Sequence, residues 1–180
     1  NKLITENSNW VRQLRQQAYK DKLTCFFNKS YVDEELTRIV EQNRSAVSLL
    51  FVKPDNFKMV NDTFGHEVGD KTLERFAQRV GDSLPPGAIA VRYRGNEIAV
   101  VLPQVGAERA AEIAAEAREV LASTSIDDLT GGEGFRLSAS ASYGTIPRDG
   151  EDPEELIALA NETVYAARSA GGGLVWHISQ

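Results

Sequence analysis

Residues 55–70 read DNFKMVNDTFGHEVGD, and the rest of the fold can be worked out from this stretch. It has apolar residues at the helical spacing 57, 60, 64 and 68, and the same spacing continues at 73, 76, 80 and 84. That period is typical of a helix with one face on a core. The triplet 64–66 interrupts the pattern with a glycine, which has the backbone freedom that a chain needs to leave a helix. The stretch therefore predicts two helices with a break at 64–66.

On both sides of these helices the pattern changes to that of strands. Residues 46–52 are an apolar run of strand length, broken only by Ser48, which predicts a buried strand. Two short apolar stretches within 88–101 flank Arg94-Gly95-Asn96. Glycine and asparagine tolerate the positive φ angles of a tight turn, so we predict a β-hairpin there.

The remaining segments predict a mixed α/β (α+β) fold. Helices are expected at 31–40, 107–122 and 153–170, strands at 135–145 and 174–178, and a Gly-rich loop at 131–134. A mainly antiparallel sheet with helices against it, in two or three layers, would bury these apolar faces. We expect one domain over residues 19–180.

Residues 1–18 are expected to form a separate N-terminal helix. Leu3, Trp10, Val11 and Leu14 share one side of it, and the other side is polar. A stripe this narrow fits the seam of a coiled coil, but it covers only about two heptads, fewer than the three or four that define one. Two alternatives stay open: a coiled-coil-like signalling helix, or a helix packed on its own domain.

Composition excludes several classes of function. The 180 residues carry 20 Lys and Arg against 26 Asp and Glu, a net charge of −6 that argues against nucleic acid as a partner. With the single cysteine Cys25, no internal disulfide can form, and no dense Cys and His group suggests zinc. No apolar run approaches the ~20 residues that span a bilayer. We expect a cytoplasmic domain, cut from a longer protein that a membrane tether could hold.

Four segments, in the same order, resemble the GGDEF family of diguanylate cyclases. Residues 55–70 follow the family pattern D-x-F-K-x-h-N-D-x-x-G-H-x-x-G-D, and about nine fixed residues at fixed spacing rarely coincide by chance. Residues 21–29, DKLTCFFNK, are similar to D-x-L-T-G-L-x-N-R, and residues 142–144, SYG, to S-x-G. Residues 92–98 read RYRGNEI where the family has R-Y-G-G-D/E-E-F. The chain is identified as a degenerate member of this family from about residue 19 onward.

The resemblance implies both a fold and a reaction. The fold is a five-stranded, mainly antiparallel sheet wrapped by helices, similar to the palm of polymerases and nucleotidyl cyclases. Active members dimerise, each subunit holding one GTP, and join two GTP into cyclic di-GMP with release of pyrophosphate. Attack of a 3′-hydroxyl on an α-phosphate builds negative charge, which paired Mg²⁺ ions held by carboxylates neutralise.

The metal positions of the family are altered in this sequence. Lys53 stands where the resemblance implies the first metal carboxylate, and Asn96 where it implies the second. Arg94 replaces the first glycine of the signature, so the local charge changes by about four units against binding two divalent cations. Within the signature Arg94-Gly95-Asn96-Glu97-Ile98, only Glu97 remains acidic. We expect no intact catalytic centre and weak or no Mg²⁺ binding.

The positions that would contact a nucleotide are partly kept. Asn61 and Asp70 match the family residues that hydrogen-bond guanine, although they could instead cap and turn between helices. The expected cationic contacts are Lys53, Arg94, Lys58 and Arg168, with Lys53 and Arg94 holding a triphosphate in place of metals. A second family arginine is lost at Gly172.

Three further positions carry expectations. The family's inhibitory product site, R-x-x-D, aligns with Pro85 and Ala88, so we expect no cyclic di-GMP binding there. Cys25 replaces a family glycine and is expected to be a buried, inert thiol. His177 is expected to lie on the surface.

Three hypotheses follow for function. The first is a catalytically inactive regulatory module that binds a guanine nucleotide and signals to other domains of its polypeptide or to a homodimer partner. The second is a ligand-free scaffold for dimerisation or protein interaction. The third is a weak cyclase that uses Asn96, Glu97 and Asp55 as metal ligands.

Overall fold

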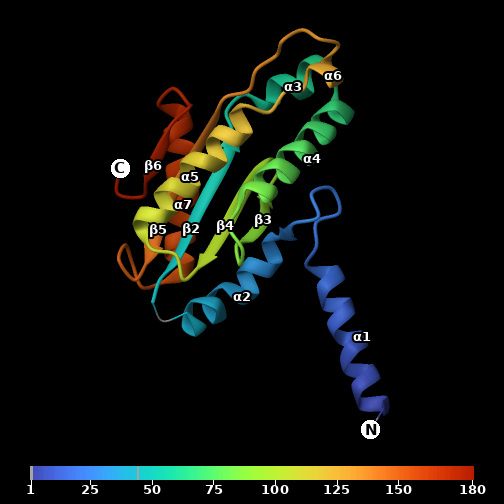
Figure 1. Cartoon of the computed structure of the whole chain (residues 1–180), viewed down its shortest axis with the longest axis vertical. Coiled ribbons are helices and arrows are strands. Elements are labelled where there is room, and N and C mark those ends of the chain that lie inside the picture. Colours follow the sequence, from blue (N-terminus) through green and yellow to red (C-terminus); the bar gives the residue numbers. More distant parts are fainter. Residues whose placement is uncertain (1, 44) are drawn as a thin grey trace.

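The computed structural model describes residues 2–43 and 45–180, and in that part of the chain helices and strands are interspersed along the sequence (Figure 1). The helices are α1 (Lys2–Ala18), α2 (Lys29–Gln42), α3 (Phe57–Phe64), α4 (His66–Ser83), α5 (Ala107–Ala122), α6 (Asp127–Thr130) and α7 (Pro153–Ser169). The strands are β1 (Phe27–Asn28), β2 (Val47–Pro54), β3 (Ile89–Arg94), β4 (Glu97–Pro103), β5 (Ala139–Ile146) and β6 (Val175–His177).

The six strands form one mixed sheet in the order β1-β3-β4-β2-β5-β6. The central pairs β3–β4, β4–β2 and β2–β5 are antiparallel, whereas the edge pairs β1–β3 and β5–β6 are parallel. Five of these strands match the predicted ones. The sixth, β1, was missed because its two residues are too short to show a period.

Helices cover both faces of the sheet, which makes three layers (Figure 1). On one face, Leu50 and Val52 of β2 pack with residues of α3, α4 and α5. On the other, Leu49 and Phe51 pack with α2 and α7. Every residue of β2 is buried, as the apolar run at 46–52 predicts, and the burial extends to Lys53 and Pro54 at the end of the strand. This inner strand, with β4 on one side and β5 on the other, is therefore covered on both faces.

The break predicted within residues 64–66 is confirmed. Gly65 separates α3 from α4 and has a φ of 87°, a conformation that residues with a Cβ rarely adopt. The helix predicted at 107–122 has the same bounds in the structure. The strand predicted at 135–145 begins later, at Ala139. The short helix α6 was not predicted.

The N-terminal helix α1 contributes no residue to the core. Leu3, Trp10 and Leu14 are 82%, 65% and 53% exposed. The alternative in which this helix packs on its own domain is therefore wrong. A coiled-coil pairing with a second chain stays a prediction. None of the helices described is long and apolar enough to span a bilayer.

Candidate functional site

The altered signature forms the turn between β3 and β4, with Arg94 opposite Glu97 in the antiparallel register. Gly95 has a φ of 49°, which is the positive angle that the hairpin prediction required. Arg94 is exposed, and its guanidinium carbon lies 5.7 Å from the centre of the Tyr93 ring. Ile98 is buried in the core. The turn therefore directs Arg94 to the surface and its last two residues inward.

Lys53 and Glu97 meet below this turn as a buried ion pair. Lys53 is the second-last residue of β2, and Glu97 is the first residue of the neighbouring strand β4. The Lys53 Nζ atom lies 3.5 Å from Glu97 Oε1. The two residues are only 7% and 2% exposed, so water screens their attraction very little.

Helix α7 completes this buried group with two residues one turn apart. Asn161 Nδ2 donates a hydrogen bond to Glu97 Oε2 at 2.8 Å, and the Tyr165 hydroxyl donates to Glu97 Oε1. The Lys53 ammonium also lies 4.1 Å from the centre of the Tyr165 ring, within range of a cation–π interaction. Sequence reasoning missed Asn161 and Tyr165. We call Lys53, Glu97, Asn161 and Tyr165 the Lys53 cluster.

Asp55 is also committed to partners within the chain. Its carboxylate accepts hydrogen bonds from the hydroxyls of Ser138 and Ser140, both at 2.6 Å, and from the backbone N–H of Gly173 at 2.9 Å. A Cβ on Gly172 would lie 2.6 Å from Asp55 Oδ2, and Gly172 has a φ of 71°. The position at which the family resemblance expects an arginine is therefore closed to side chains by this carboxylate.

The turn is tied to the segment after α1 through Arg92. The Arg92 guanidinium donates to the carbonyl of Gly95 at 2.8 Å and to Asp21 Oδ1 at 3.1 Å. Burial alone would raise the pKa of Asp21. Hydrogen bonds from the backbone N–H and hydroxyl of Thr24, together with the Arg92 charge, outweigh burial and hold that pKa below its usual value. The ionised carboxylate is thus part of the folded state.

The residues expected to contact guanine lie together at the junction of α3 and α4. Asn61 is half-buried near the end of α3, and Asp70 is exposed in the second turn of α4. A Cβ on Gly69 would overlap Asn61 Oδ1, so only glycine at 69 leaves this amide its place. The structure therefore brings Asn61 beside the turn of α4 that carries Asp70. Whether they bind a base stays a prediction.

The other expected cations are spread over the surface. Lys58, in the first turn of α3, and Arg168, in the last turn of α7, are both exposed. Pro85 and Ala88 lie in the connection between α4 and β3. Of the expected cationic contacts, only Lys53 is buried.

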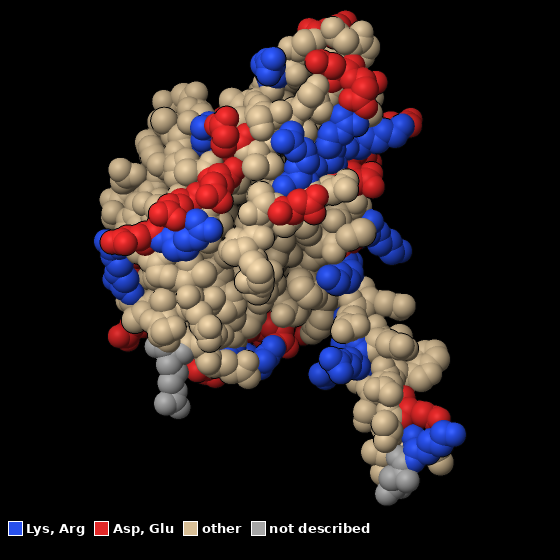
Figure 2. Space-filling model, viewed as in Figure 1, with Lys and Arg blue, Asp and Glu red and all other residues tan. Residues whose placement is uncertain are grey.

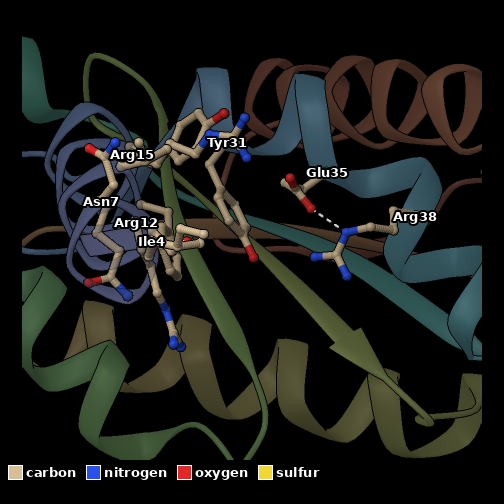
Figure 3. Close-up of a pocket in the computed structure, with 12 residues that line it drawn as sticks. Ile4, Asn7, Arg12, Arg15, Tyr31, Glu35 and Arg38 are labelled. Atoms are coloured by element: carbon tan, nitrogen blue, oxygen red, sulfur yellow. Dashed lines mark hydrogen bonds and ion pairs between the residues drawn. The ribbon is translucent and has the colours of Figure 1, made fainter. Parts of the chain in front are cut away.

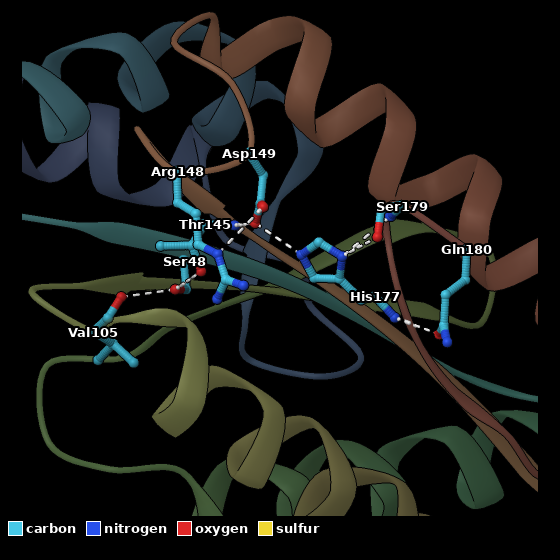
Figure 4. A network of polar contacts seen from close by, with 8 residues as sticks. All are labelled: Ser48, Val105, Thr145, Arg148, Asp149, His177, Ser179 and Gln180. Carbon is cyan, nitrogen blue, oxygen red and sulfur yellow. Dashed lines mark hydrogen bonds and ion pairs between the residues drawn. The ribbon is translucent and has the colours of Figure 1, made fainter.

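Two expectations about single residues are wrong. Cys25 is exposed and has a φ of 61°, so it occupies a tight turn where the family glycine costs less strain. His177 is a half-buried link in the network of Figure 4 rather than a free surface residue. Its Nε2 lies 2.9 Å from Asp149 Oδ2, and its Nδ1 lies 2.7 Å from Ser179 Oγ. The link fastens β6 to the loop that follows β5.

A band of basic side chains crosses the face formed by α4 (Figure 2). Each is bonded within the chain: Lys71 to Glu67, Arg75 to both oxygens of Asp128, and Arg79 to a threonine hydroxyl. The hydrogen bonds from Arg75 hold the pKa of Asp128 below its usual value. Two of these three cations are therefore paired with carboxylates, whereas Arg79 is hydrogen-bonded to a neutral group and keeps its charge.

The carboxylates of the site do not come together as a metal-ligand group. Among residues 2–43 and 45–180, no three His, Cys, Asp or Glu side chains lie close enough to hold a metal ion. Glu97 faces an ammonium ion, and Asp55 accepts three hydrogen bonds. The site is therefore an ion pair between Lys53 and Glu97, with the ring of Tyr165 packed against the ammonium group.

Comparison with known proteins adds independent findings. The sequence model of the family described as "Diguanylate cyclase, GGDEF domain" matches residues 18–173. Response regulator PleD of Caulobacter vibrioides is 31% identical over 161 residues, which are 88% of this chain and 36% of PleD. The probable diguanylate cyclase DgcT of Escherichia coli is 29% identical over 167 residues, 89% of this chain and 36% of DgcT. The chain thus spans about a third of the length of these relatives.

Solved structures agree with these sequence matches. The coiled coil and GGDEF domain of DgcB from Caulobacter crescentus, solved in complex with c-di-GMP, superposes with a TM-score of 0.85 at 26% identity. The alignment covers 98% of this chain and 94% of the DgcB chain. It therefore includes the N-terminal helix as well as the sheet domain.

Proposed function

The chain belongs to the GGDEF family of diguanylate cyclase domains, which act in cyclic di-GMP signalling, and from that premise we propose that this domain has lost cyclase activity. It acts instead as a regulatory module that senses a guanine nucleotide and signals to the other domains of its polypeptide. The observation that carries the proposal is the buried ammonium of Lys53, 3.5 Å from Glu97 Oε1.

The residues present do not fit the Mg²⁺ ions that the family uses. A magnesium ion takes about six oxygen ligands close to 2.1 Å, usually several waters together with one or two protein carboxylates and the phosphates of a substrate. Here Glu97 already balances a lysine, and an ammonium ion repels a metal from the same space. Asn96 offers a neutral amide oxygen only.

The phosphate side of the site is also altered in a way that supports the proposal. Lys53 is held by Glu97 and Tyr165, and Gly172 cannot accept a side chain while Asp55 keeps its hydrogen bonds. Arg94 remains as an exposed cation at the turn. Of the two cations expected to hold a triphosphate, Arg94 is the one free to reach solvent.

The guanine side supports nucleotide sensing. Asn61 and Asp70 keep the residue types that suit guanine, since an amide and a carboxylate offer both donors and acceptors. Gly69 keeps the space that the Asn61 amide occupies. A site that recognises the base but not a metal-bound triphosphate can report nucleotide without consuming it.

A cyclase assay tests the loss of activity. The protein is incubated overnight with GTP and either Mg²⁺ or Mn²⁺, and cyclic di-GMP is measured by mass spectrometry. We expect no product above a reaction without protein. Product that disappears in the Glu97→Ala variant would show instead a residual cyclase and overturn the proposal.

Isothermal titration tests the sensing role. GTP and GDP are titrated in EDTA into the wild type, Asn61→Ala and Asp70→Ala, with Asp62→Ala as the control because Asp62 is an exposed neighbour. We expect heat of binding in the wild type and the control, and a loss of about tenfold in affinity in the other two. Flat titrations at millimolar nucleotide would remove the sensing role.

The exposed apolar side of α1 favours a second candidate function, a scaffold for dimerisation. An isolated helix of 17 residues is marginal in water, so a partner surface for Leu3, Trp10 and Leu14 would stabilise it. Flat nucleotide titrations together with a concentration-dependent dimer in analytical ultracentrifugation would favour this scaffold over the sensor.

A further inference from the structure

A hollow between α1 and α2 lies away from the Lys53 cluster. These helices diverge from the segment 19–28 like the two arms of a V (Figure 1). The hollow has a volume of about 830 Å³. We call it the α1–α2 groove, and its lining residues are Ile4, Asn7, Ser8, Val11, Arg12, Arg15, Gln16, Tyr19, Phe27, Tyr31, Glu35 and Arg38.

The inner part of the groove is aromatic and apolar. The rings of Phe27 and Tyr31 stack with centres 4.0 Å apart, and Tyr19 meets Tyr31 edge-on at 5.6 Å. Ile4 and Val11 of α1 are 65% and 49% exposed. Figure 3 shows the Tyr31 ring between the side chains of α1 and the Glu35–Arg38 pair. Covering an apolar surface of this kind with a partner removes it from water and so lowers the free energy.

The rim of the groove is basic. Arg12 and Arg15 come from α1 and Arg38 from α2, and the only acidic lining residue is Glu35. Glu35 is already paired with Arg38. No carboxylate in the described part of the chain forms an ion pair with Arg12 or Arg15. The groove therefore carries two uncompensated positive charges on a protein of net charge −6.

The shape of the groove selects an elongated occupant. Its α1 wall runs from Ile4 to Gln16, which is about 18 Å or a little over three helical turns. A helix that places apolar side chains at successive turns can contact such a wall along its whole length, whereas a compact small molecule cannot. Acidic residues flanking that apolar stripe would meet Arg12 and Arg15.

From these features we propose that the α1–α2 groove binds an acidic, amphipathic helix of a partner protein. A second α1 does not suit the groove, because α1 itself carries Lys2, Arg12 and Arg15 against the single acid Glu6. Leu3, Trp10 and Leu14 do not line the groove. Of the four apolar residues that share one side of α1, only Val11 lines the groove, so the other three stay available for pairing with a second chain.

Two synthetic helical peptides of about five turns test the proposal. Both carry the same leucine stripe; one is flanked by glutamate and the other by lysine. Binding is followed by fluorescence anisotropy of a label on each peptide at low salt. We expect the glutamate peptide to bind with micromolar affinity, weakening as salt rises, and the lysine peptide to bind at least about tenfold more weakly.

Charge reversal supplies the decisive comparison. The Arg12→Glu/Arg15→Glu variant should bind the glutamate peptide at least about tenfold more weakly than the wild type does, and should bind the lysine peptide more tightly. The control Arg109→Glu/Arg148→Glu makes the same change in net charge at α5 and at the loop before α7, and should bind as the wild type does. Circular dichroism checks that both variants fold.

Three outcomes would overturn the proposal. They are equal binding of the two peptides, binding that the Arg12→Glu/Arg15→Glu variant leaves unchanged, and no binding of either peptide. If that variant changes the monomer–dimer equilibrium in ultracentrifugation while neither peptide binds, the groove is an interface between copies of this chain.

Discussion

Replacing Lys53 by methionine removes a buried charge while keeping a side chain of similar length. The Lys53 ammonium lies 3.5 Å from Glu97 Oε1, and Coulomb's law at an effective dielectric constant of about 20 gives an attraction of about 5 kcal/mol. Desolvation offsets part of this, and removing one partner of a buried pair usually costs about 3–5 kcal/mol. Because Glu97 keeps its hydrogen bonds from Asn161 and Tyr165, we expect Lys53→Met to lower the free energy of unfolding by about 2–3 kcal/mol.

A double-mutant cycle isolates the interaction energy between Lys53 and Glu97 from the effects that each substitution has on the surrounding residues. Glu97→Gln should cost a similar amount, because it leaves the ammonium of Lys53 buried without a counter-charge. The double variant contains neither charge, so its loss should be smaller than the sum of the two single losses by at least about 2 kcal/mol. The free energies come from urea unfolding at pH 7, followed by far-UV circular dichroism and tryptophan fluorescence.

The control is an exposed pair of the same kind. Lys71 and Glu67 are 55% and 84% exposed, and Lys71→Met should change the free energy of unfolding by no more than about 0.5 kcal/mol. If the two site substitutions prove additive within about 0.5 kcal/mol, Lys53 and Glu97 do not stabilise each other. The charge-pair account of the site would then be refuted.

Three more predictions follow from the site. Gly172→Ala should lower the free energy of unfolding by about 2–3 kcal/mol, since its Cβ displaces the Asp55 carboxylate and its φ is positive; Gly132→Ala, with positive φ but open space, should cost only about 1 kcal/mol in the same urea assay. Asp21→Asn should cost about 1 kcal/mol at pH 7. Because the pKa of Asp21 is lowered in the folded protein, this contribution is present above the unfolded value of about 3.9 and is lost as pH falls through the folded value, so the stabilities of wild type and variant should converge in acid unfolding curves only below the folded pKa. Millimolar Mg²⁺ should leave the midpoint of thermal unfolding unchanged in calorimetry, and a rise of several degrees would contradict the altered metal site.

Much of the fold could be predicted because its signals are local. The break at Gly65, the hairpin turn at Gly95 and the helix at 107–122 each depend on residues adjacent in sequence. The strand β1 has no such signal: its two residues pair in parallel with Val91 and Arg92, far along the chain. The start of β5 was misplaced because residues 135–138 have strand-like composition but form a loop.

The candidate site was predictable only in part. Motif spacing located Lys53 and Asn96, because their positions are fixed by a strand end and a tight turn. Nothing local indicates that Asn161 and Tyr165 would complete the Lys53 cluster, since that contact exists only once α7 packs across the sheet.

The two wrong expectations about single residues have the same origin. A lone cysteine is usually buried, but Cys25 occupies a turn position with a positive φ, which holds it at the surface. His177 looked exposed at the end of a strand, but the loop after β5 folds back and supplies Asp149 as its partner. In both cases the backbone path decided the environment of the side chain.

The Lys53–Glu97 pair also constrains how this sequence can change over generations. Exchanging Lys53 for a carboxylate in one step would leave two acidic groups in a space that water hardly reaches, where like charges are costly. Changing Glu97 first would leave the ammonium buried alone. Either order passes through a less stable protein, so selection for stability alone preserves both residues, whatever ligand the domain has gained or lost.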